Sequence, residues 1–268
     1  MLPFKRTVRS KVSLAFVCLT ALLFVAFQIH SHTRTWKLRI VQRTVETSRA
    51  RVAKNSSCVQ DAGVSSRKVA IVHYCGGERY ANISDLSEKN VREYAYKHNL
   101  EVHVANETSF PSEVFFTPKA WLKLAYLLHV LAVSSHEWLI WLDCDALIVK
   151  QEERFETLLN AMNVSSRHDM VIAKDIDASP FNTGVMFIRR SEWSTGTISR
   201  ALRLAKRVGI REHPWWEQRA LHVLYNEDNH DEREKMLIVK DRWRMNAFES
   251  LHEERDGTFI WHRVNCRQ

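Results

Sequence analysis

Short, unbroken apolar runs that alternate with segments of helical periodicity most constrain what this chain can fold into. The runs at 68–74 and 138–142 are typical of strands buried on both faces, whereas 118–134 carries an apolar stripe at helical spacing. This alternation predicts an α/β fold with a mainly parallel central sheet and flanking helices. Strands are predicted at 68–74, 101–104, 138–142, 170–173, 184–188, 236–239 and 259–262, and helices at 86–98, 118–134, 192–207 and 214–225.

An uncharged apolar run occupies residues 12–29, directly after four basic residues, Lys5, Arg6, Arg9 and Lys11. Eighteen helical residues span about 27 Å, which is enough for a thin bilayer. No small-x-small cleavage site follows, so a retained anchor is favoured over a cleaved signal peptide. We expect a cytosolic tail at 1–11, a transmembrane signal-anchor at 12–29, a stem at 30–67 and a folded domain at 68–268.

The net positive charge of the chain comes from its N-terminal part. Eleven Lys and Arg residues and one Glu lie within 1–54, so the net charge of this segment is +10. The net charge of the whole chain is +8, which leaves −2 for residues 55–268. A nearly neutral domain without a basic stripe argues against nucleic-acid binding.

Acceptor sequons and cysteines point to a luminal domain. Asn55, Asn82, Asn106 and Asn163 each begin an Asn-x-Ser/Thr sequon, which has meaning only in the secretory lumen. Outside the apolar run, Cys58, Cys75, Cys144 and Cys266 allow three disulfide connectivities, and the sequence does not choose among them. Their spacing does not fit structural zinc.

An Asp-Cys-Asp triplet follows the most apolar predicted strand. Asp143 and Asp145 are two residues apart, so at a strand end their carboxylates project to the same side. An isolated Asp-x-Asp is more often a solvated turn. At the carboxyl end of a buried strand, however, where ligands bind in such sheets, two carboxylates indicate a binding site. Paired carboxylates suit Mg²⁺ or Mn²⁺ and leave coordination positions open for phosphate oxygens.

Several segments of the chain, which occur in the same order as in the family, resemble glycosyltransferase family 34, the retaining galactosyl-, mannosyl- and xylosyltransferases. They are the segment Glu137 to Ala146 with its Asp-x-Asp, Trp121 to Leu124, Phe181 to Ser194, Glu217 to Leu221, and His262 to Arg267. The resemblance covers residues 68–268 and implies that they form a catalytic domain with the GT-A fold of nucleotide-diphospho-sugar transferases. Two departures are Asn265 in place of Gly and Trp216 in place of an acid.

The resemblance also implies roles for individual residues. Asp143, Asp145 and His262 would hold the metal, and the imidazole favours Mn²⁺ over Mg²⁺. Glu217 and Gln218 would lie at the reacting carbon of the donor sugar. The donor would contact Gly76, Lys123, Cys144 and Arg267, and the sugar and acceptor pocket would include Asn182, Gly184 and Asp175. From sequence alone, however, Lys123 fits a solvated helix lysine better.

The expected function is therefore metal-dependent, retaining transfer of a hexose or pentose to a glycan acceptor in the Golgi lumen, by a single-pass type II membrane protein. UDP-galactose, UDP-xylose and GDP-mannose remain open as donors, as does homo- or hetero-oligomerisation. One alternative is a non-catalytic family member that serves as a partner subunit of an active transferase, although all the implied ligands are present. Another is a metal-dependent phosphohydrolase, which would need a denser set of ligands for two metals.

Overall fold

The computed structural model describes residues 69–77, 80–105, 119–176, 179–253 and 255–263. The predicted tail, anchor and stem lie outside these residues, as do Asn55, Cys58, Asn106, Asn265, Cys266 and Arg267. Among the described helices, none is both long enough and apolar enough to cross a bilayer.

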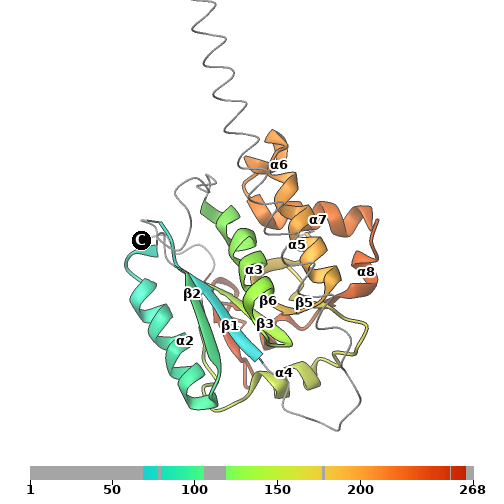
Figure 1. Ribbon diagram of the computed structural model, residues 1–268. Coiled ribbons are helices and arrows are strands. Elements are labelled where there is room, and N and C mark those ends of the chain that lie inside the picture. The colour runs from blue at the N-terminus through green and yellow to red at the C-terminus, as the bar shows by residue number, and fades with distance from the viewer. Residues whose placement is uncertain (1–68, 78–79, 106–118, 177–178, 254, 264–268) are drawn as a thin grey trace, which may run out of the picture. The chain divides into compact units, whose positions relative to one another are not determined.

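The central layer is a six-stranded sheet in the order β2-β1-β3-β6-β5-β7 (Figure 1). Strand β1 pairs in parallel with both β2 and β3, and β5 pairs in parallel with β7. Strand β6 runs antiparallel to its neighbours β3 and β5. The strands are β1 (Val69–Tyr74), β2 (Glu101–Ala105), β3 (Trp138–Asp143), β5 (Met170–Ala173), β6 (Asn182–Arg189) and β7 (Met236–Val239).

The sheet is therefore mixed: β1, β2, β3, β5 and β7 run in one direction, in keeping with a mainly parallel sheet, and β6 alone among its strands runs in the other. A parallel crossover needs a dozen or more residues, usually including a helix, but only residues 174–181 connect β5 to β6. The short connection makes β6 turn back along β5. As a result, the first residues of β6 lie at the same edge of the sheet as the carboxyl ends of β1, β3 and β5.

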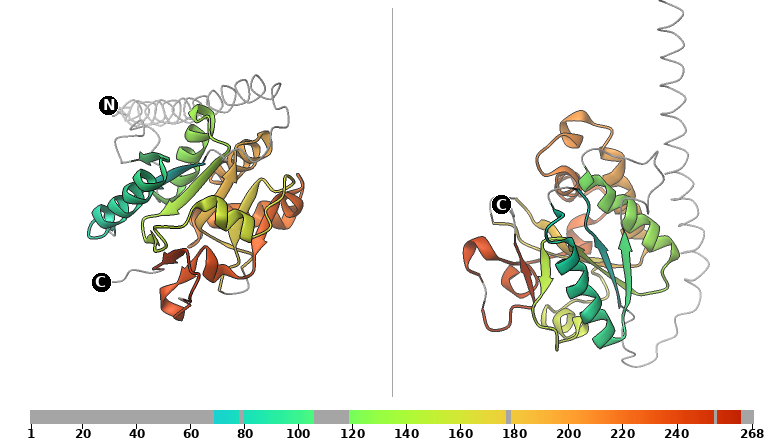
Figure 2. Two further views of the ribbon diagram at one scale, coloured as in Figure 1. Left: turned by 90° about the horizontal axis from the view of Figure 1, so that it is seen from below. Right: turned by 90° about the vertical axis from the view of Figure 1, so that its left-hand side faces the viewer.

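Helices cover both faces of the sheet. On one side, α2 (Ser84–His98) and α4 (Phe155–Ala161) share a core with alternate strand residues such as Ile71 and Ile140. On the other side, α3 (Leu122–Val133) contacts β1 and α5 (Glu192–Leu204), and α5 packs on α7 (Trp216–Glu227) (Figure 2). Shorter elements are η4 (Lys119–Trp121), α6 (Val208–Arg211), α8 (Glu232–Lys235), η5 (Arg242–Arg244) and η6 (Glu249–Leu251).

A second, three-stranded sheet places the end of the described chain beside the Asp-x-Asp segment. Its order is β4-β9-β8, with β4 (Ala146–Ile148), β8 (Ala247–Phe248) and β9 (Ile260–His262). Strand β9 runs antiparallel to β4, and His262 pairs with Ala146. Only β9 was predicted, because β4 and β8 are too short for a periodic pattern to emerge.

Candidate active site

A disulfide joins the carboxyl ends of β1 and β3. Cys75 is bonded to Cys144, so Cys144, which the family resemblance places at the donor, has no free thiol. This is one of the three connectivities that the sequence leaves open. The bond ties the Gly76-Gly77 turn to the Asp-x-Asp segment across 69 residues of sequence. Cys144 can therefore meet a ligand only as part of the cystine or through its backbone.

Two carboxylates and one imidazole converge just beyond these strand ends. The ligand atoms of Asp143, Asp145 and His262 all lie within 4.8 Å of one another. Asp145 and His262 are buried, whereas the side chain of Asp143 is 27% exposed. Two hard oxygens and one borderline nitrogen are a donor set that fits a divalent cation such as Mn²⁺.

The hydrogen bonds of His262 fix which ring nitrogen faces the carboxylates. Its Nδ1 lies 2.8 Å from Oδ1 of Asn246, an oxygen that can only accept, so Nδ1 carries the proton. Nε2 then lies 3.2 Å from Oδ1 of Asp145. A proton or a cation must sit between these two atoms, because an imidazole lone pair and a carboxylate oxygen would otherwise repel each other. Asn246 thus holds the ring in the orientation that ligation needs.

His262 also controls the charge of Asp145. Burial alone would raise the pKa of this carboxyl. The hydrogen bond of His262 and its positive charge when the ring is protonated, with contributions from a backbone hydrogen bond and from Lys123, outweigh burial and hold the pKa of Asp145 below its usual value. Asp145 is therefore ionised and able to bind a cation.

Lys123 on α3 connects the acidic segment to α7. Its Nζ lies 2.8 Å from Oδ1 of Asp143 and 2.9 Å from Oε1 of Glu217, and it donates to the carbonyl oxygen of Thr183. The side chain is buried, which corrects its interpretation as a solvated helix lysine. Burial would lower the pKa of Lys123, but the two carboxylates raise it above its ordinary value, so the lysine is charged.

Asp143 is further fixed by Trp141. The indole Nε1 donates to Oδ1 of Asp143 at 2.6 Å, the same oxygen that Lys123 contacts. Both partners approach Oδ1, so Oδ2 is the oxygen that can turn to a cation.

A third network holds the start of α7 against β6. Oε1 of Gln218 accepts from the backbone N–H of Thr183 at 2.9 Å, and its Nε2 donates to Asp175 at 3.0 Å. The hydroxyl of Thr183 donates to Glu217 at 3.2 Å. Glu217 and Gln218 are therefore presented in fixed orientations, and Asp175 belongs to the same network.

Asn182 and Gly184 lie on the other side of β6, toward the second sheet. Oδ1 of Asn182 accepts from the backbone N–H of Gly184 at 2.8 Å and from Nδ2 of Asn246 at 3.1 Å. A Cβ on Gly184 would lie 2.1 Å from Cε1 of His262, so only glycine leaves room for the ring. The Asn-x-Gly block thus supports the imidazole in addition to lining the pocket.

These residues line one cleft of about 640 Å³, a volume that suits a small-molecule ligand. Ten of the predicted site residues with described positions meet here directly, as does Cys144 of the disulfide. They are Gly76, Lys123, Asp143, Asp145, Asp175, Asn182, Gly184, Glu217, Gln218 and His262. Arg267 lies outside the described residues, so its contact with the donor stays a prediction.

The sequence did not single out Asn246, Thr183 or Trp141. Asn246 belongs to the β8 region, where no predicted element drew attention to a buried amide. Trp141 lies within the strand predicted at 138–142, and Thr183 directly precedes the one predicted at 184–188, so neither is marked as a site residue. Trp141 lies two residues before Asp143 on the same face of β3, whereas the register of β3 against β6 is what brings Thr183 near the acidic segment.

Comparisons with known proteins agree with this architecture. Residues 68–163 match the galactosyl transferase GMA12/MNN10 family. No curated protein matches the sequence. Among solved structures, a glycosyltransferase involved in glycosylation of the major capsid of PBCV-1 superposes with a TM-score of 0.61 at 14% identity, over 75% of this chain and 94% of that one.

Two weaker likenesses carry no argument of their own. One is the apo form of the glycosyltransferase GlyE of Streptococcus pneumoniae, with a TM-score of 0.47 at 14% identity over 74% of this chain and 55% of that one. The other is mouse xyloside xylosyltransferase 1, with a TM-score of 0.46 at 14% identity over 84% of this chain and 92% of that one.

The family match covers the stretch that contains β1, α3 and the Asp-x-Asp segment, and the PBCV-1 enzyme shares the GT-A-like arrangement of the mixed sheet and its helices. Residues 68–163 are therefore similar to the galactosyl transferase GMA12/MNN10 family, and the described part of the chain shares its fold with a solved glycosyltransferase.

Proposed function

We propose that this chain is a glycosyltransferase of the galactosyl transferase GMA12/MNN10 family that moves a hexose or pentose from a nucleotide-sugar to a glycan acceptor, with Mn²⁺ as cofactor and with retention of configuration. The observation that carries the proposal is the convergence of Asp143, Asp145 and His262 within 4.8 Å, inside the cleft of about 640 Å³. UDP-galactose, UDP-xylose and GDP-mannose are the candidate donors.

In this proposal Asp143, Asp145 and His262 hold the cation, and Asn246 fixes the ring of His262. A bound divalent cation supplies Lewis-acid neutralisation of the charge that develops on the departing diphosphate. Lys123 keeps Asp143 oriented and balances the negative charge of Glu217. Arg267 is proposed to add a fork of donors to the diphosphate.

The pairing of Glu217 favours one route to retention. A double displacement needs a carboxylate nucleophile, but Oε1 of Glu217 lies 2.9 Å from Lys123 and accepts from Thr183. A carboxylate whose negative charge is shared with two donors is a weaker nucleophile than a free one. We therefore propose reaction on the front face of the donor. The bond from sugar to diphosphate breaks, the acceptor oxygen bonds on the same face, and its proton passes to the leaving phosphate.

The test is a panel of the three donors with the full-length chain and Mn²⁺, measuring release of nucleoside diphosphate with and without glycan acceptors. We expect turnover with one donor and its loss in Asp145→Ala, by at least about 10³-fold. Asp256→Ala is the matched control, since Asp256 is fully exposed. Absence of turnover with every donor, or full activity in Asp145→Ala, would refute the proposal.

We further propose a Golgi location with the catalytic domain in the lumen. Of the four sequons, the two with described positions, Asn82 and Asn163, are exposed and accessible to glycosylation. The Cys75–Cys144 disulfide suits an oxidising compartment. When the protein is expressed in cells with a secretory pathway, N-glycosidase treatment should increase its mobility on a denaturing gel. Asn82→Gln and Asn163→Gln should each reduce this change in mobility by the contribution of one glycan. An unmodified chain would contradict the luminal orientation.

A further inference from the structure

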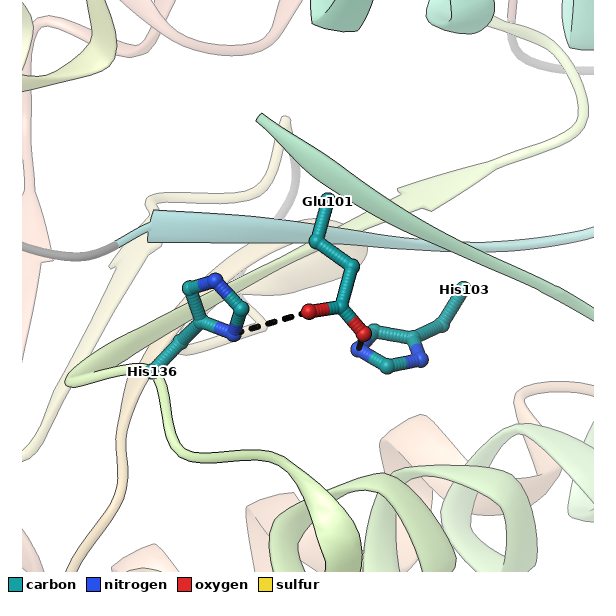
Figure 3. Close-up of side chains that lie close together, drawn as sticks. All are labelled: Glu101, His103 and His136. Atoms are coloured by element: carbon teal, nitrogen blue, oxygen red, sulfur yellow. Dashed lines mark ion pairs between the residues drawn. The ribbon is translucent and has the colours of Figure 1, made fainter. Parts of the chain in front are cut away.

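A second group of side chains of the kinds that bind metals lies at the opposite end of the central sheet. Glu101 and His103 are two residues apart on the edge strand β2, and His136 precedes β3. Figure 3 shows the carboxylate of Glu101 between the two imidazole rings. The ligand atoms of the three side chains all lie within 4.8 Å of one another.

This group is separate from the catalytic cleft. Glu101 pairs with Ala70 near the start of β1, whereas Asp143 pairs with Tyr74 at its end. Four residues of a strand extend about 13 Å. None of Glu101, His103 and His136 lines the cleft.

The contacts within the group are close, but ordinary hydrogen bonds do not account for them. Nε2 of His103 is buried and has no hydrogen-bond partner among the described residues, although Oε1 of Glu101 is only 3.0 Å away. The distance is short, but the alignment of a hydrogen bond is missing. The other carboxylate oxygen lies 3.6 Å from Nδ1 of His136. A cation between the carboxylate and the rings would give Nε2 of His103 the partner that it lacks.

The separations suit tetrahedral zinc. Zinc binds His nitrogen and Glu oxygen at about 2.0–2.2 Å, which places two ligand atoms about 3.4 Å apart. The observed distances of 3.0 Å and 3.6 Å bracket that value. Two imidazoles and one carboxylate favour Zn²⁺ over Mg²⁺ or Ca²⁺, which prefer oxygen ligands throughout.

The backbone holds the group in place before any metal arrives. The register of β2 against β1 fixes Glu101 and His103, which project to the same face. The carbonyl of His136 accepts from Nε of Arg190 at 3.1 Å, and its backbone N–H donates to Oγ of Ser134 at 3.2 Å. Oγ of Ser134 also lies 2.9 Å from Nδ1 of His136, so a cation bound at that nitrogen would replace Ser134 as its partner. The side chain of Glu101 is 53% exposed and gives a metal access from solvent.

From this geometry we infer that Glu101, His103 and His136 form a second, zinc-class metal site that links the edge strand β2 to the segment before β3. Three protein ligands leave one position for water. The site does not depend on the proposed transferase reaction.

Metal binding is measured on the full-length chain carrying Asp143→Ala and Asp145→Ala, so that the catalytic cation site does not contribute. We expect this chain to retain one equivalent of Zn²⁺ after dialysis, measured by elemental analysis. Co²⁺ should give the intense visible absorption of a tetrahedral site. Adding Glu101→Gln or His103→Ala should raise the Kd for Zn²⁺ by at least about 100-fold.

His230→Ala is the matched control, because His230 is exposed and outside the group, and it should leave the Kd unchanged. Glu101 is half exposed, so Glu101→Gln should fold normally even if His103→Ala does not. In the otherwise unmodified chain, Glu101→Gln should leave donor hydrolysis intact. Absence of Zn²⁺ binding, or an unchanged Kd in Glu101→Gln, would overturn the inference.

Discussion

The backbone of Gly184 lies against the imidazole of His262, where a Cβ would come within 2.1 Å of Cε1. No side chain can be added there unless the ring moves. Since the ring is also held by Asn246 and faces Asp145, its displacement would disturb the cation site directly.

Gly184→Ala should therefore weaken Mn²⁺ binding far more than it weakens the fold. We expect the Kd for Mn²⁺ to rise at least about 10-fold, because the imidazole is pushed away from Asp145. Titration calorimetry with Mn²⁺ measures this. Gly209→Ala is the control, since a Cβ there meets nothing within 4 Å. Equal affinity in Gly184→Ala and Gly209→Ala would show that His262 does not bind the cation.

Asn246→Ala should loosen the same ring without crowding it. The substitution removes the oxygen that holds Nδ1 of His262, and loss of such an outer partner costs about 10- to 100-fold in metal affinity. Mn²⁺ affinity and the KM for Mn²⁺ should change together, while kcat at saturating Mn²⁺ changes less. Asn246→Asp, which keeps an acceptor oxygen, should recover most of the loss. A fall in kcat alone would contradict the orienting role.

Lys123→Met should strongly destabilise the fold. It leaves the buried carboxylate of Glu217 and its neighbour Asp143 facing each other without a counter-charge, which costs about 3–5 kcal/mol in the free energy of unfolding. Chemical denaturation measures the loss. Lys150→Met is the control and should cost less than about 1 kcal/mol, because its ion pairs are on the surface. Adding Glu217→Gln to Lys123→Met should recover part of the stability.

Replacing both Cys75 and Cys144 by Ser should lower the free energy of unfolding by about 2–4 kcal/mol, because the unfolded chain loses a crosslink that closes a long loop. Denaturation under non-reducing conditions measures the change. Adding a reductant should lower the stability of the wild-type protein but leave that of the double variant unchanged. If the reductant affects both equally, the disulfide is not the cause.

His73 should make stability sensitive to pH. Burial lowers its pKa from 6.5, although Leu142, whose carbonyl lies 3.0 Å from Nδ1, opposes this effect. The unfolded chain therefore takes up a proton at a higher pH than the folded one. Stability should be fully present above about pH 6.5 and should fall as the pH drops below it. His73→Asn retains a donor for Leu142 but does not titrate, so its stability should vary less between pH 7 and pH 5.5. Parallel curves for the two proteins would contradict the assignment.

Much of the fold could be predicted from local pattern. The apolar runs that became β1, β3 and β5 are continuous because both faces of the sheet are covered, and such runs are visible in sequence. The strand pattern assigns β6 no direction, because the direction of a strand depends on the length of the preceding connection and not on the strand's own residues. The sequence did contain a clue to this direction: no helical segment is predicted between the strands at 170–173 and 184–188, and a parallel connection usually needs one.

The acidic pair and its distant histidine could also be named in advance, but their supports could not. Lys123 resembles any helix lysine until α3, α7 and the end of β3 are packed together. Asn246 directly precedes the two-residue strand β8, which has no periodic signature, so nothing local separates this asparagine from other polar residues. Both cases concern polar groups whose partners are far away in the chain.

The alternation of side chains along β6 makes this strand a partition between two parts of the cleft. Asn182 and Gly184 face the imidazole, and Thr183 between them faces the lysine and α7. Insertion of a single residue ahead of Asn182 that slipped the strand by one position would exchange these two sides at once. Length changes in the connection from β5 to β6 should therefore be tolerated only when they leave the pairing of Leu142 with Val185 in place.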